Sequence, residues 1–121
     1  MIEFKNVSKV YDNGSVALDD VCLTINDGEF ILVCGHSGAG KSTLFKLLTH
    51  EVVPDTGTVI VDDFDVTRMK RSKIPKLRRK LGVVFQDFRL LPNKTVSENI
   101  AFALEVIEEK PKVIKEKVSH V

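Results

Sequence analysis

The stretch Gly35-His36-Ser37-Gly38-Ala39-Gly40-Lys41-Ser42 follows a continuous apolar run, Phe30-Ile31-Leu32-Val33-Cys34. It matches the spacing G-x-x-x-x-G-K-[ST], in which small residues let backbone N–H groups converge on phosphate oxygens. Apolar residues at helical spacing come next, so we predict a buried strand, a phosphate loop and a helix over residues 30–50. This order predicts an α/β P-loop NTPase fold and makes a chance glycine-rich turn a poor alternative.

Each polar group of the loop has a predicted role toward a nucleoside triphosphate. Lys41 places a cation on the outer phosphates, and the Ser42 hydroxyl is a hard oxygen ligand suited to Mg²⁺. The free N–H groups and the dipole of the following helix add to the anion site. We expect the Thr43 N–H to reach the first phosphate, and we interpret His36 as a loop residue whose ring has no catalytic role.

Residues outside the loop predict further strands and helices. Alternating apolar positions predict two antiparallel strands over residues 2–11 and 21–25, joined by a turn at 12–14. A short strand is predicted at 58–61 and a second buried strand at 81–85, with Gln86 at its C-terminal end. Helices are predicted from about Pro75 to Lys80, after the capping box of Thr95 and Glu98, and in a final amphipathic segment beyond Pro111.

Length and composition are ordinary for one globular domain. The chain has 121 residues, 43% of them hydrophobic, and a net charge of +1 that gives no overall attraction to nucleic acid or membrane. No apolar run approaches the ~20 residues of a membrane span. The two cysteines, Cys22 and Cys34, lie in apolar runs, and we expect buried free thiols.

The sequence resembles the ATP-binding subunits of ABC transporters along its whole length. Tyr11 matches the aromatic residue that stacks on adenine in that family, and Val83-Val84-Phe85-Gln86-Asp87 is similar to its Q-loop. Phe88-Arg89-Leu90-Leu91-Pro92-Asn93-Lys94-Thr95-Val96 and Glu98-Asn99 look like the branch that acts in bacterial cell division. Lipoprotein-releasing and macrolide-export ATPases are similar there too. His36 and Ser97 replace the proline and the aromatic residue expected of the family.

This resemblance implies a set of site residues and a domain plan. The nucleotide-binding set is Tyr11, Val16, Gly35, Ser37, Gly38, Ala39, Gly40, Lys41, Ser42 and Thr43, and the Mg²⁺ ligands are Ser42 and Gln86, of which Gln86 also orients the attacking water. The chain corresponds to the N-terminal part of a nucleotide-binding domain. Its plan is an antiparallel β region (1–29 and 56–66), the strand, loop and helix (30–50), a core strand with the Q-loop (81–87), and helices at the start of the helical subdomain (95–121).

The resemblance also implies partners and a location. The ligands are ATP and Mg²⁺, and the region Gln86–Leu91 receives a membrane-embedded subunit of the FtsX type. The complete protein forms a homodimer with ATP between the subunits, and no nucleic acid is involved. We expect a cytoplasmic protein held at the inner face of the plasma membrane by its partner.

The family's LSGGQ signature, Walker B aspartate, catalytic glutamate and switch histidine are not found in this chain. We therefore expect the chain to bind ATP but to hydrolyse it negligibly. One alternative places Walker B at Thr58-Val59-Ile60-Val61-Asp62-Asp63, where an apolar strand ends in two acids.

Two other functions remain open on the sequence: a nucleotide kinase or other P-loop enzyme, and a non-catalytic nucleotide-binding module. The acid-free basic segment from Arg68 to Lys80 has two interpretations of its own. It is a solvated helix face, which we favour, or a surface attracted to anionic lipid.

Overall fold

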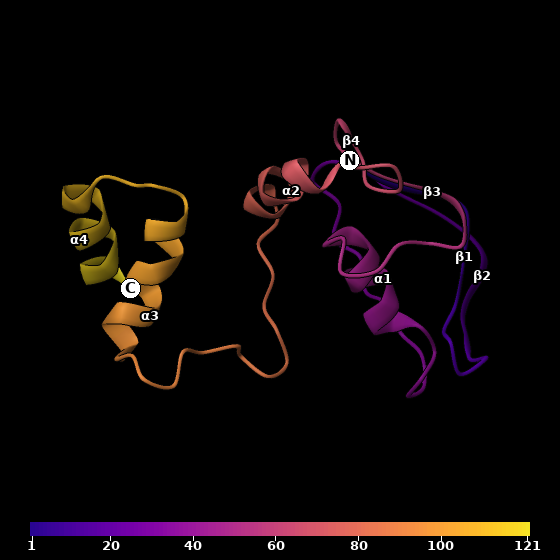
Figure 1. Cartoon of the computed structure of the whole chain (residues 1–121), viewed down its shortest axis with the longest axis horizontal. Helices are drawn as coiled ribbons and strands as arrows, with labels where there is room; N and C mark the ends of the chain where they lie inside the picture. The colour runs from indigo at the N-terminus through magenta and orange to yellow at the C-terminus, as the bar shows by residue number, and fades with distance from the viewer. The chain divides into compact units, whose positions relative to one another are not determined.

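Figure 1 shows the computed structural model, which describes residues 1–121 as two units, residues 1–81 and residues 82–121. The first unit holds an antiparallel sheet and the helices α1 and α2. The second unit holds the helices α3 and α4. The two units are described separately below.

The sheet of the first unit has four strands in the order β2-β1-β3-β4. They are β1 (Ile2–Val10), β2 (Val16–Ile25), β3 (Thr56–Val61) and β4 (Phe64–Asp65), and every pair is antiparallel. The predicted antiparallel β region is confirmed. It forms because alternating apolar residues give each long strand one face that can be buried.

Two helices complete the core of this unit. Helix α1 (Lys41–Leu48) buries Leu47, and helix α2 (Ile74–Lys80), which follows the 3-10 turn η1 (Arg71–Lys73), buries Leu77. Both side chains join one cluster with Phe4, Val7, Leu18, Val59, Val61 and Val66. Figure 1 shows α1 lying against the sheet, and burial of Leu47 holds the helix there.

The two predicted buried strands are absent. Residues 30–34 and 81–85 form no strand, and the sheet contains neither run. Phe30 is 91% exposed and Val84 is 94% exposed. A strand is held by hydrogen bonds to a neighbouring strand, and neither run pairs with another segment of this chain. The part of the parallel core sheet expected here is therefore not formed within these residues.

The cysteines were also predicted wrongly. Cys22 and Cys34 are free thiols, as expected, but both are exposed. Cys22 lies on the outward face of β2 between the half-buried Val21 and Leu23, and Cys34 belongs to the unpaired apolar run. An apolar neighbourhood in the sequence did not produce burial, because the alternation of a strand and the lack of a paired neighbour decided the outcome.

The Walker B alternative at residues 58–63 is wrong. β3 pairs antiparallel with β1 and β4, and Asp62 and Asp63 form the turn between β3 and β4. Asp62 accepts a hydrogen bond from the Met1 amino group at 2.8 Å and lies 3.7 Å from Lys80 Nζ. These cations hold the pKa of the Asp62 carboxyl below its usual range, with the Met1 hydrogen bond as the largest cause. This carboxylate neutralises its neighbours and faces no metal site.

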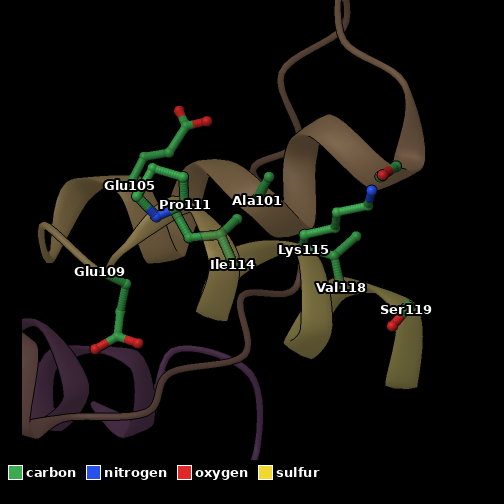
Figure 2. Close-up of a pocket in the computed structure, with 9 residues that line it drawn as sticks. Ala101, Glu105, Glu109, Pro111, Ile114, Lys115, Val118 and Ser119 are labelled. Atoms are coloured by element: carbon green, nitrogen blue, oxygen red, sulfur yellow. The ribbon is translucent and has the colours of Figure 1, made fainter.

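The second unit is a helix pair, α3 (Val96–Val106) and α4 (Pro111–His120). The predicted capping box is confirmed: Thr95 Oγ1 accepts from the Glu98 N–H, and Glu98 accepts from the Thr95 N–H at 2.7 Å. A groove of about 670 Å³ lies between the helices, and Ala101, Ile114 and Val118 are among the residues that line it. Figure 2 shows these three side chains on the two helices. No helix of the chain has the length and apolar character needed to cross a membrane.

Candidate nucleotide-binding site

The phosphate loop leads directly into helix α1, and Gly40 is the residue that makes this possible. Gly40 has φ +82°, a left-handed conformation, and a Cβ placed on it would lie 2.1 Å from the Ala17 carbonyl oxygen of β2. Glycine alone lacks the atom that would collide, so the main chain passes close to the strand. The second glycine of the motif is therefore required by packing against the sheet as well as by phosphate chemistry.

The Lys41 side chain is hydrogen-bonded to the main chain of the loop. Its Nζ donates to the carbonyl oxygens of Gly35 and His36, at 2.6 Å and 2.7 Å. These two bonds fold the lysine side chain back over the loop. The positive charge is therefore held beside Gly35 and His36. Phosphate oxygens bound there would meet a cation that is already positioned.

The loop also offers backbone donors that have no acceptor. Ser37 and Gly38 lie outside any helix or strand, and their N–H groups donate to no acceptor within the protein. Lys41 and Ser42 are the first two residues of α1, so their N–H groups have no partner within the helix. Residues 35–39 are exposed to solvent. An accessible ring of N–H donors beside one lysine is suited to a polyphosphate.

Tyr11, the residue predicted to stack on adenine, lies beside the first turn of α1. Its hydroxyl is 3.2 Å from Thr43 Oγ1, and Thr43 is buried in the first turn of α1. The Thr43 N–H donates to the Gly40 carbonyl at 2.9 Å, so its predicted bond to a phosphate would have to be shared or exchanged. Val16, at the start of β2, is 60% exposed. Stacking of adenine on Tyr11 and contact with Val16 stay predictions.

Asp55 fixes the end of β1 next to Tyr11. Its carboxylate accepts from the Val10 N–H at 2.6 Å and from Lys9 Nζ at 2.9 Å. These bonds, that of Val10 above all, hold the pKa of the Asp55 carboxyl below its usual range. Sequence reasoning missed this residue, because a single aspartate after a proline reads as an ordinary turn.

Gln86 belongs to the other unit, so its predicted Mg²⁺ and water roles stay predictions. The residues after it adopt an unusual backbone: Phe88 and Arg89 have φ of +56° and +45°. The Arg89 guanidinium lies 3.7 Å from the centre of the Phe85 ring, an attractive cation–π contact. Phe88 and Leu90 are 75% and 66% exposed, which leaves apolar surface in the region predicted to receive a membrane subunit.

Asn99 holds the end of this region, and sequence reasoning gave it no structural role. Its side chain accepts from the Leu91 N–H at 2.8 Å and donates to the carbonyl oxygens of Leu91, Lys94 and Thr95. One amide thereby fixes the loop before α3. An asparagine one turn inside a predicted helix, after a proline-containing loop, is the signal that could have revealed it.

Comparison with known proteins decides the family. The family model described as ABC transporter matches residues 18–121. The chain belongs to the ABC transporter family. The cell division ATP-binding protein FtsE of Bacillus subtilis is 53% identical over the whole chain, and FtsE of Mycobacterium tuberculosis is 45% identical. In both cases the chain covers 53% of the relative, so it spans about half the length of these curated proteins.

A solved structure has the same fold. It is the dimeric post-hydrolysis state of the ATP-binding cassette MJ0796, bound to ADP and Pi. The TM-score is 0.88 at 32% identity, over 99% of this chain and 55% of that one. The recognition of an ABC cassette fold, corresponding to the N-terminal part of such proteins, is confirmed.

Proposed function

We propose that this chain is the N-terminal part of an FtsE-like ATP-binding subunit, and that it binds ATP with Mg²⁺ through residues 35–43. The observation that carries this proposal is the loop itself: Lys41 bonded to two loop carbonyls, beside accessible N–H donors. Identity of 53% to an FtsE over the full chain supports the assignment to the cell-division branch. Mg²⁺ would be held by the exposed Ser42 hydroxyl together with phosphate oxygens.

We further propose that the 121-residue chain alone turns over little ATP. Hydrolysis needs charge neutralisation at the phosphates and a carboxylate or equivalent group that orients water. Lys41 and the N–H groups supply the first requirement. Residues 35–43 include no aspartate or glutamate that could meet the second requirement. A steady-state rate close to that of an intact ATPase, lost in Lys41→Ala, would contradict this proposal.

The proposed partner is a membrane-embedded subunit of the FtsX type, which would hold the protein at the inner face of the plasma membrane. The exposed Phe88 and Leu90 support a protein contact in the region Gln86–Leu91. Co-purification with FtsX from co-expressing cells tests it. We expect Phe88→Asp to abolish capture and Val96→Asp, another exposed apolar position of the same unit, to leave it unchanged.

Thermal unfolding of the chain tests the nucleotide proposal. A ligand that binds only the folded state raises its stability by RT ln(1 + [L]/Kd), about 2.7 kcal/mol at a hundredfold excess over Kd. We expect Mg-ATP to raise the melting temperature of wild type and to leave Lys41→Ala unchanged. Equal shifts in both proteins would show that the nucleotide acts elsewhere.

A further inference from the structure

Tyr11 carries two chemically different groups, an aromatic ring and a hydroxyl. The hydroxyl already has a partner within the protein: it lies 3.2 Å from Thr43 Oγ1, and one of the two hydroxyls donates to the other. Thr43 is only 5% exposed, so water competes weakly for its side chain. A hydrogen bond between such groups contributes more when the alternative is an unsatisfied buried hydroxyl.

The main chain of Tyr11 is fixed independently of this bond. Its N–H donates to the Ser15 carbonyl at 2.9 Å, and its own carbonyl accepts from Gly14 at 2.8 Å. The preceding residue, Val10, is held by Asp55. The Tyr11 hydroxyl therefore projects from a rigid turn, and it can hold Thr43 in place rather than follow it.

Thr43 transmits the position of Tyr11 to the phosphate loop. It stands in the first turn of α1, directly after Lys41 and Ser42, and its N–H donates to the Gly40 carbonyl at 2.9 Å. A shift of Thr43 would move Gly40 and the N–H groups at the start of the helix. These are the donors assigned to phosphate in the proposed function.

We propose that Tyr11 is a positioning residue for the phosphate subsite: its hydroxyl, through Thr43, holds the first turn of α1 in its anion-binding geometry. This inference rests on the proposed function and deepens it. The hydroxyl affects phosphate binding through Thr43, whereas the aromatic ring stays available to stack on a base. The two groups of one side chain therefore serve different parts of the ligand.

The difference can be measured with a ligand that has no base. Inorganic tripolyphosphate with Mg²⁺ offers the phosphate subsite alone, and Mg-ATP offers both parts. Tyr11→Phe keeps the ring and removes the hydroxyl. We expect this variant to raise the dissociation constants of both ligands by the same factor, about threefold to tenfold. That factor corresponds to the contribution of one hydrogen bond. Tyr11→Leu removes the ring as well, and we expect a further loss for ATP and none for tripolyphosphate.

A double-mutant cycle tests whether the effect passes through Thr43. Thr43→Val removes the other hydroxyl at nearly constant shape, and we expect Tyr11→Phe to cause no additional loss in that background. Thr43→Ser keeps a hydroxyl and should restore the sensitivity to Tyr11→Phe. Thermal unfolding of every variant without ligand shows whether each protein is folded. If Tyr11→Phe does not fold, the tripolyphosphate affinities of Thr43→Val and Thr43→Ser are compared instead, because they differ in the hydroxyl that bonds to Tyr11.

The outcomes separate this inference from the proposed function. If wild type binds neither ligand, the proposed function fails and the inference fails with it. If wild type binds both and Tyr11→Phe leaves tripolyphosphate unchanged, the inference alone is overturned. The inference would also be overturned if the losses of binding free energy caused by Tyr11→Phe and Thr43→Val added fully in the double variant. The two hydroxyls would then act independently.

Discussion

Gly40 and Ala17 approach so closely that a Cβ on Gly40 would lie 2.1 Å from the Ala17 carbonyl oxygen. Ala17 belongs to β2, and Gly40 is the last residue of the phosphate loop before α1. The contact locks the beginning of the helix to the sheet. The geometry of the anion site therefore depends on a strand that contributes no polar group of its own to the phosphate.

We predict that Gly40→Ala destabilises the first unit by more than about 2 kcal/mol. An L-residue in the left-handed region costs about 1–2 kcal/mol, and the collision with Ala17 adds to this cost. Gly38→Ala is the matched control, because Gly38 has a similar φ of +81° but nothing lies within 4 Å of its added Cβ. Urea unfolding measures both. Equal destabilisation by the two substitutions would show that the contact with Ala17 is unimportant.

Leu47 should contribute more to stability than any exposed apolar residue of α1. It is fully buried, so Leu47→Ala leaves a cavity in the core, at a cost of about 2–5 kcal/mol. Phe45→Ala changes a larger side chain on the same helix, but Phe45 is 55% exposed, and we expect a cost below about 1 kcal/mol. Denaturant midpoints of the two variants measure the difference. A larger loss of stability in Phe45→Ala than in Leu47→Ala would contradict the placement of Leu47 in the core of this unit.

The helix pair should lose helicity in acid through Glu98. The hydrogen bonds from Thr95, its backbone N–H first, hold the pKa of the Glu98 carboxyl below its usual value of 4.5. A lowered folded pKa means that the stabilisation is present above the unfolded pKa and is lost as the pH falls through the folded pKa. Far-UV circular dichroism of wild type should therefore decline below about pH 4.5.

Glu98→Gln is the control for that titration. A glutamine can still accept from the Thr95 N–H, so the capping box persists without an ionisable group. We expect the part of the acid transition that involves α3 to become flatter in this variant. An unchanged acid transition would assign it to other carboxylates, such as Asp55, whose pKa is also lowered by hydrogen bonds from Val10 and Lys9.

The sequence predicted those features that depend on neighbouring residues. Alternation predicted β1 and the second half of β2, which was expected over residues 21–25 and begins at Val16. The phosphate-loop spacing predicted the start of α1, and the residues Thr95 and Glu98 predicted the capping box. All of these are present in the structure. Each is specified within a few residues, so the local pattern contains the information.

Features that depend on distant residues were predicted wrongly or missed. The runs at 30–34 and 81–85 have the composition of buried strands, but a strand also needs a neighbour, and the pattern of a run says nothing about whether one is present. The bond between Tyr11 and Thr43 and the contact between Gly40 and Ala17 join segments that are far apart in the sequence. No spacing rule predicts such contacts, although the resemblance to a family had placed Tyr11 near the nucleotide.

Equilibrium dialysis with radiolabelled ATP and Mg²⁺ tests the central claim most directly. The 121-residue chain should show saturable binding of one ATP, competed by unlabelled Mg-ATP, and Lys41→Ala should lose it because the loop's only cation is removed. Lys46→Ala, on the same helix but outside the loop, should bind as wild type does. Absence of saturable binding by wild type, or equal binding by Lys41→Ala, would contradict the account.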